Sequence, residues 1–118
     1  RGRGVSAPEE GTAPESDMSL WDIRVVVDRI EGRSVCGMRP GDWCEVTESS
    51  RLRIPEGGHF CLYALQAALP LIPAKQRDLP AGDWLERDNE VACPDPEERL
   101  IMRIERTRRV DLRADDLT

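Results

Sequence analysis

The sequence predicts a small α+β domain, in which an antiparallel sheet of about four strands has one main helix packed on it. Runs of β-branched and apolar residues alternate with Pro-Gly and Gly-Gly turns, as expected for short strands. Only the segment 59–72 has the spacing of an amphipathic helix. A chain of 118 residues is long enough for one domain with a core and too short for two ordinary ones.

Four strands and one short extended piece are expected along the chain. These are 20–32, part of 39–49, a short extended piece at 52–58, then 90–93 and 99–107. In the first strand Ile23, Val25 and Val27 share one face, because side chains alternate along a strand. That face is predicted to line the core.

The predicted helix, 59–72, carries small and apolar residues close to one face: Phe60, Ala64, Ala67 and Ala68. Pro70 should end or kink it, since proline removes a backbone donor. A polar loop follows over 73–90, and Trp84 is its expected anchor in the core.

The ends of the chain differ from the middle in composition. Residues 1–19 are rich in Gly, Pro, Ala and Glu and are expected to form a disordered tail. The single domain is placed at 20–108, and an acidic C-terminal tail at 109–118.

The charge balance excludes several classes of partner. A net charge of -6 argues against nonspecific binding to nucleic acid or to an anionic membrane surface. No apolar run is long enough to span a membrane, and the N-terminal arginines precede no apolar segment of a secretory signal. A cytoplasmic location is therefore expected. Arginine outnumbers the single lysine, which is typical of a GC-rich genome such as that of an actinobacterium.

The four cysteines are expected to stay largely reduced in that compartment. Three interpretations of Cys36, Cys61 and Cys93 stay open: core packing, a metal site and a reactive thiol. With His59 they would make a tetrahedral zinc set, although the tight Cys-x-x-Cys pairs typical of zinc sites are missing. Zinc is thus the one cofactor that the sequence suggests.

Cys61 is the strongest candidate for a reactive thiol. It lies at the expected start of the helix, where unsatisfied amides favour a thiolate. His59, two residues earlier, is the candidate base, and Asp95 is a further candidate acid or base. Asp95 also fits a simple turn role, since aspartate side chains cap local amides.

Three stretches together resemble a family of small uncharacterised prokaryotic proteins with three cysteine motifs. The stretches are "CGMRPGDW", "FCLYAL" and "ACPDP" followed by "MRIER", and they cover residues 23–107 in the family's order. The resemblance implies a shared fold and a shared site at Cys36, Cys61 and Cys93. Gly37 and Leu62 replace prolines frequent in that family, and Cys44, at a usually aromatic or aliphatic position, is interpreted as core filling.

The predicted function is that of a small soluble accessory or binding protein with a cysteine-based site. Its partner would be a small molecule or a protein, and the chain would be a monomer or a homodimer. The alternative is a small enzyme without an organic cofactor: a cyclase, isomerase or thiol-dependent catalyst, such as bacterial specialised metabolism uses. The binding protein is preferred because no clear acid–base pair stands out in the sequence.

Overall fold

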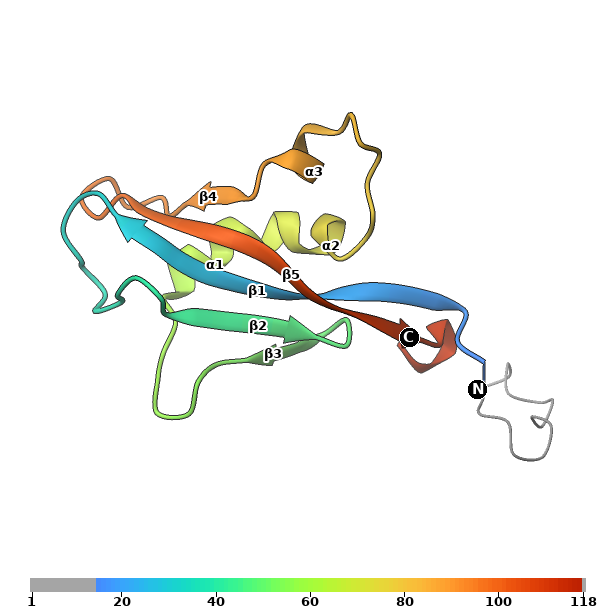
Figure 1. The fold of residues 1–118 in the computed structure, drawn as a ribbon. Coiled ribbons are helices and arrows are strands. Elements are labelled where there is room, and N and C mark those ends of the chain that lie inside the picture. Colours follow the sequence, from blue (N-terminus) through green and yellow to red (C-terminus); the bar gives the residue numbers. More distant parts are fainter. Residues whose placement is uncertain (1–14, 118) are drawn as a thin grey trace.

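The computed structural model describes residues 15–117, and they form an antiparallel sheet of five strands in the order β3-β2-β1-β5-β4 (Figure 1). The strands are β1 Met18–Ile30, β2 Trp43–Thr47, β3 Arg51–Arg53, β4 Glu90–Ala92 and β5 Leu100–Leu112. One main helical segment packs on this sheet, so the predicted α+β class is confirmed, with one strand more than expected.

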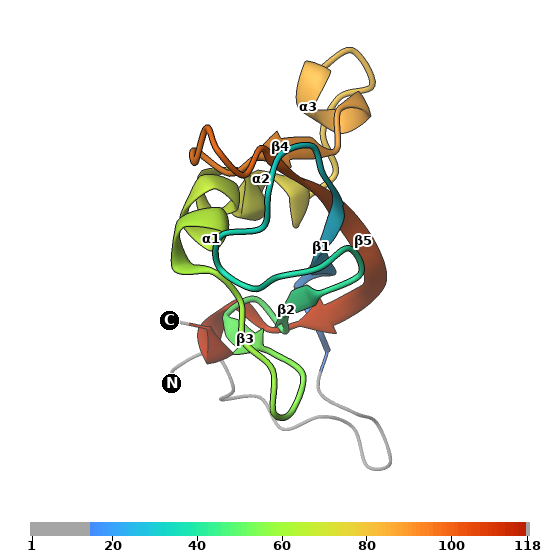
Figure 2. The same cartoon turned by 90° about the vertical axis from the view of Figure 1, so that its left-hand side faces the viewer.

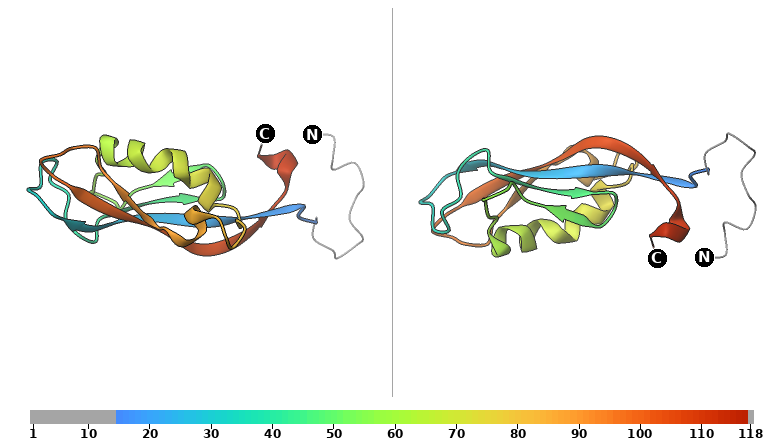
Figure 3. Two further views of the ribbon diagram at one scale, coloured as in Figure 1. Left: turned by 90° about the horizontal axis from the view of Figure 1, so that it is seen from above. Right: turned by 90° about the horizontal axis from the view of Figure 1, so that it is seen from below.

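The two long strands β1 and β5 form the centre of the sheet. Their pairing runs from Met18 opposite Leu112 to Ile30 opposite Leu100. Beyond the end of β2 they continue as a two-stranded ribbon toward the chain termini (Figure 3). The last strand is therefore longer than the predicted 99–107, and much of the segment expected to be an acidic tail is ordered in β5 and a 3-10 turn, η3 Ala114–Asp116. The predicted N-terminal tail lies mostly outside the described residues.

Two irregularities bend the central pair. One register shift lies between Asp22 and Ile23, and a second lies between Val27 and Arg29. An extra residue in one strand increases local twist and bends it. Viewed from the end, the strands form an arc around the helical segment, which fills its concave side (Figure 2).

The helical segment is continuous from α1 Leu62–Ala68 through the 3-10 turn η2 Leu69–Leu71 to α2 Ile72–Lys75. Pro70 lies in the tighter turn, so the predicted change of helix geometry at this residue is confirmed. Ala64 and Ala68 are fully buried. Small side chains at these positions let the helix approach the sheet closely.

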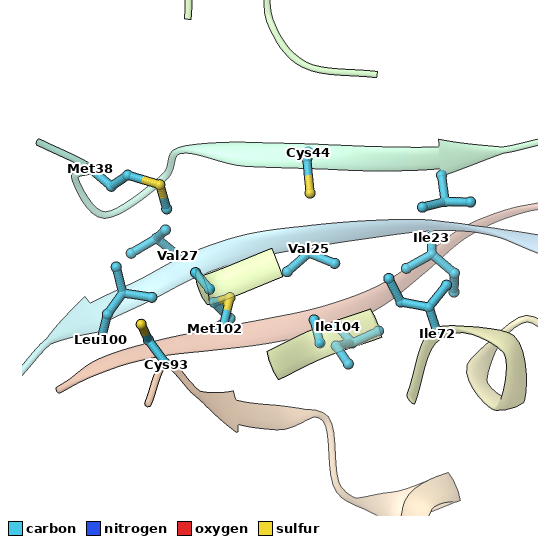
Figure 4. Packing of buried hydrophobic residues seen from close by; sticks show 13 residues of the cluster. Ile23, Val25, Val27, Met38, Cys44, Ile72, Cys93, Leu100, Met102 and Ile104 are labelled. Atoms are coloured by element: carbon cyan, nitrogen blue, oxygen red, sulfur yellow. The ribbon is translucent and has the colours of Figure 1, made fainter. Parts of the chain in front are cut away.

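The core lies between the concave face of the sheet and the helix (Figure 4). Ile23, Val25 and Val27 are buried together on this face, as their alternation predicts. Cys44 projects from β2 into the same cluster with no exposed surface, which agrees with its interpretation as core filling.

The loop after α2 is held by polar contacts, and the prediction that Trp84 anchors it is wrong. Trp84 begins the short helix α3 Trp84–Arg87 and is 60% exposed. Lys75, only 2% exposed, instead donates from Nζ to the carbonyl oxygen of Leu85 at 2.8 Å and to Oδ1 of Asn89 at 2.6 Å. The sequence pattern favoured the tryptophan because aromatic residues usually supply the buried area in such loops.

Within residues 15–117, no helix is long and apolar enough to cross a membrane.

Replacing Lys75 with methionine should lower the free energy of unfolding by about 1–3 kcal/mol, because both hydrogen bonds of the buried ammonium group are lost. The exposed Trp84 should tolerate alanine with a loss below about 0.5 kcal/mol. Urea unfolding of both variants measures the difference. A larger loss for Trp84→Ala than for Lys75→Met would contradict this account of the loop.

Candidate functional site

Three of the four cysteines line one pocket of about 530 Å³ at the end of the sheet where β1 finishes and β5 begins. Cys36 comes from the β1–β2 loop, Cys61 from the residue before α1, and Cys93 from the loop after β4. The rest of the wall is mainly apolar: Val35, Leu62, Tyr63 and Pro94. The structure thus brings together the three cysteines that the sequence grouped.

A buried carboxylate, Glu98, shares this pocket and is 1% exposed. Its Oε2 accepts the backbone N–H of Val35 at 2.8 Å, the N–H of Cys36 at 3.4 Å and the Cys36 thiol at 3.4 Å. Glu98 therefore fixes the β1–β2 loop and orients Cys36. Within residues 15–117 it forms no ion pair with an arginine or lysine.

Asp95 shapes the turn that carries Glu98. Its Oδ1 accepts the backbone N–H of Glu97 at 2.9 Å and that of Glu98 at 3.4 Å, and its carbonyl oxygen accepts the N–H of Arg99. Arg99 has a positive φ of 47°, which closes the turn before β5. Asp95 also lines the pocket, so its carboxylate is engaged in turn formation at the edge of the site.

The two loops of the site meet at Gly32. Its N–H donates to the carbonyl oxygen of Glu98 at 2.9 Å. A Cβ at this position would lie 2.0 Å from the carbonyl oxygen of Glu97 and 2.9 Å from that of Glu98. Only glycine allows this approach, and the approach fixes where Glu98 sits relative to Cys36.

The thiols of Cys36 and Cys93 are protonated at neutral pH. Burial raises the pKa of Cys36 to about 11, and the hydrogen bond to Glu98 and the neighbouring Cys61 thiol also raise it. Burial likewise raises the pKa of Cys93, with smaller contributions from Cys61, Glu98 and Asp95. Its sulfur points into the core cluster beside Leu100 (Figure 4). Cys93 is both a core residue and part of the pocket wall.

Cys61, like Cys36, is a partly exposed thiol of the site. It is the residue before α1, and its backbone N–H points at Sδ of the buried Met38, 2.9 Å away. This contact ties the start of the helix to the β1–β2 loop. Cys61 and Cys36 are close enough for their thiols to interact.

His59 lies outside this group of thiols in an exposed position. Its Nε2 is 2.9 Å from the carbonyl oxygen of Cys36. A carbonyl oxygen only accepts hydrogen bonds, so Nε2 carries the proton and is not available as a base. The ring packs near Gly37, which has a φ of +80°.

In the described part of the chain, no group of three or more His, Cys, Asp or Glu side chains has the arrangement needed to hold a metal ion. The pocket collects three thiols and two carboxylates, but no three of them lie in such an arrangement. The predicted zinc set of Cys36, Cys61, Cys93 and His59 therefore has no preformed geometry here.

Sequence reasoning missed Glu98, the residue that organises the site. In "CPDPEER" nothing in residue type separates it from Glu97, which is exposed. The available signal was the Asp95 turn, since a capped turn fixes the direction of the side chains that follow it. The burial of Glu98 depends on contacts with the distant β1–β2 loop.

Fold and site together define an antiparallel α+β domain with a thiol-lined pocket. Comparison of the chain with protein-family models, with curated proteins and with solved structures found no match. The resemblance to the three-cysteine family thus stays a prediction.

The folded protein should react slowly with an aromatic disulfide reagent at Cys36, Cys44 and Cys93, and fastest at Cys61. Raising a thiol pKa from 9.0 to about 11, as at Cys36 and Cys44, lowers the thiolate fraction about a hundredfold near neutral pH. Stopped-flow absorbance measures the four phases, and Cys61→Ser should remove the fastest. Four equally fast thiols in the folded protein would contradict this assignment; after unfolding, all four should react quickly.

Substituting Gly32 with alanine should destabilise the protein by about 1–3 kcal/mol, because the added Cβ collides with backbone rather than with a movable side chain. Gly82→Ala is the matched control, since a Cβ there meets no atom within 4 Å. Thermal unfolding of the two variants tests the loop contact. Equal midpoints would show that the two loops do not meet closely at Gly32.

Proposed function

We propose that this protein is a noncatalytic binding module that takes a small organic molecule into the pocket formed by Cys36, Cys61, Cys93 and Glu98. The observation that carries the proposal is the convergence of three separate chain segments on one mainly apolar space with two fixed carboxylates, Glu98 and Asp95. Pockets with apolar walls and few fixed polar groups are typical of small-molecule sites.

The state of the thiols favours binding over catalysis. A nucleophilic cysteine requires a thiolate, yet burial raises the pKa of Cys36 and of Cys93. His59, the candidate base for Cys61, is exposed and does not line the pocket. The thiols then serve as soft, weakly polar parts of the wall.

The exposed apolar side chains at the pocket mouth favour an organic ligand over a bare ion. Leu62 is 67% exposed and Tyr63 is 63% exposed, and both line the pocket. An ion at the thiols would leave these side chains in water, whereas an organic molecule would cover them.

Benzyl alcohol, a small uncharged probe, should shift the NMR amide signals of Val35, Cys36 and Leu62 in a saturable manner. Leu62→Ala should weaken its binding about threefold to tenfold, since part of the apolar wall is lost. Leu69→Ala is the matched control, because Leu69 is 48% exposed on the same helical segment but outside the pocket.

A lack of probe binding to the wild-type protein would contradict the proposal. If the wild-type protein shows no saturable shift with any aromatic probe, the pocket is not a site for small organic molecules. The Leu69→Ala variant should behave as the wild type does.

A further inference from the structure

From the charges around Glu98 we infer that the natural ligand is a small organic cation, an ammonium group on an apolar body, and that Glu98 Oε1 receives it. This inference rests on the proposed function, since it names the class of ligand for the same pocket.

The two carboxylate oxygens of Glu98 differ in their hydrogen bonds. All three hydrogen bonds that the Glu98 carboxylate accepts end on Oε2. Within residues 15–117, no donor is recorded for Oε1, and no side-chain oxygen that is fully enclosed lacks a partner. Because this side chain is 1% exposed and lines the pocket, we assign the free position on Oε1 to a donor that enters the pocket.

The carboxylate of Glu98 lacks a cationic partner in the described part of the chain. Burying a carboxylate without a cation is costly, and a fitting cation lowers that cost. Two arginines on the loops of the site are engaged elsewhere: Arg33 pairs with Glu97, and Arg99 donates to the carbonyl oxygen of Glu31. Among residues 15–117, none supplies a positive charge to Glu98. We therefore assign the missing positive charge to a ligand.

The other groups of the pocket suit an organic cation better than a metal ion. The protonated thiols of Cys36 and Cys93 add no negative charge that would select a metal ion, while Asp95 adds a carboxylate at the edge. Tyr63 lines the pocket and offers an aromatic ring, which attracts organic cations. Leu62 and Val35 provide apolar surface for the body of the ligand.

Benzylamine, which is protonated at neutral pH, benzyl alcohol and phenylacetate share one ring and differ in charge. Benzylamine should bind at least about tenfold more tightly than benzyl alcohol, because hydrogen bonds to charged groups are the stronger ones. Phenylacetate should bind most weakly. NMR amide shifts of the full chain measure the three affinities.

The variant Glu98→Gln keeps the shape and removes the charge. It should lower benzylamine affinity at least about tenfold while changing benzyl alcohol affinity less than about twofold. Glu97→Gln, an exposed neighbour, is the matched control and should leave both affinities unchanged. A midpoint of thermal unfolding close to that of the wild type confirms that Glu98→Gln is folded; if it is not, Glu98→Asp, which keeps the charge, should retain the preference for benzylamine.

Failure of the inference and failure of the proposed function give different results. Equal affinities for benzylamine and benzyl alcohol would overturn the organic cation and leave the pocket as a binding site. No binding of any probe would overturn both. Stoichiometric Zn²⁺ binding that excludes benzylamine would also overturn both, in favour of a metal site.

Discussion

The antiparallel pairing of β1 with β5 is the interaction on which the remaining structure depends. It joins residues near the two ends of the described chain, from Met18 opposite Leu112 to Ile30 opposite Leu100. Because the strands run in opposite directions, the loop that leaves β1 and the loop that enters β5 meet at the same end of the sheet. Cys36 lies in the first loop, and Cys93 and Glu98 lie in the second. The pocket is thus a direct result of strand direction, and the helix start closes it with Cys61.

The carboxylate of Glu98 is held in the site by neutral groups. Glu98 is held by backbone amides and a thiol instead of by an arginine, so its position is fixed while its charge stays uncompensated within the described chain. Elsewhere the same protein pairs its carboxylates readily, as Glu86 does with Arg106 at 2.6 Å. The charge of Glu86 is paired with an arginine, whereas that of Glu98 is held only by neutral donors.

The sequence predicts the fold well where the signal is local. Alternation in β1 and small residues on the helix are visible in the pattern, and both faces are buried as expected. The grouping of three cysteines followed from their motifs. The burial of Glu98 and of Lys75 was not predictable, because each depends on partners contributed by another loop. Trp84 was misplaced for the same reason, since burial of a large side chain is decided by the space that distant segments leave.

The burial of Lys75 protects its amine from chemical modification. Lys75 is the only lysine of the chain, and its ammonium group is enclosed by the carbonyl of Leu85 and the amide of Asn89. An acylating reagent or a lysine-modifying enzyme therefore finds no accessible lysine side chain while the domain is folded. Acylation of Lys75 would occur only when the loop opens or the domain unfolds. The rate of acylation of this one side chain would therefore measure how often such opening takes place.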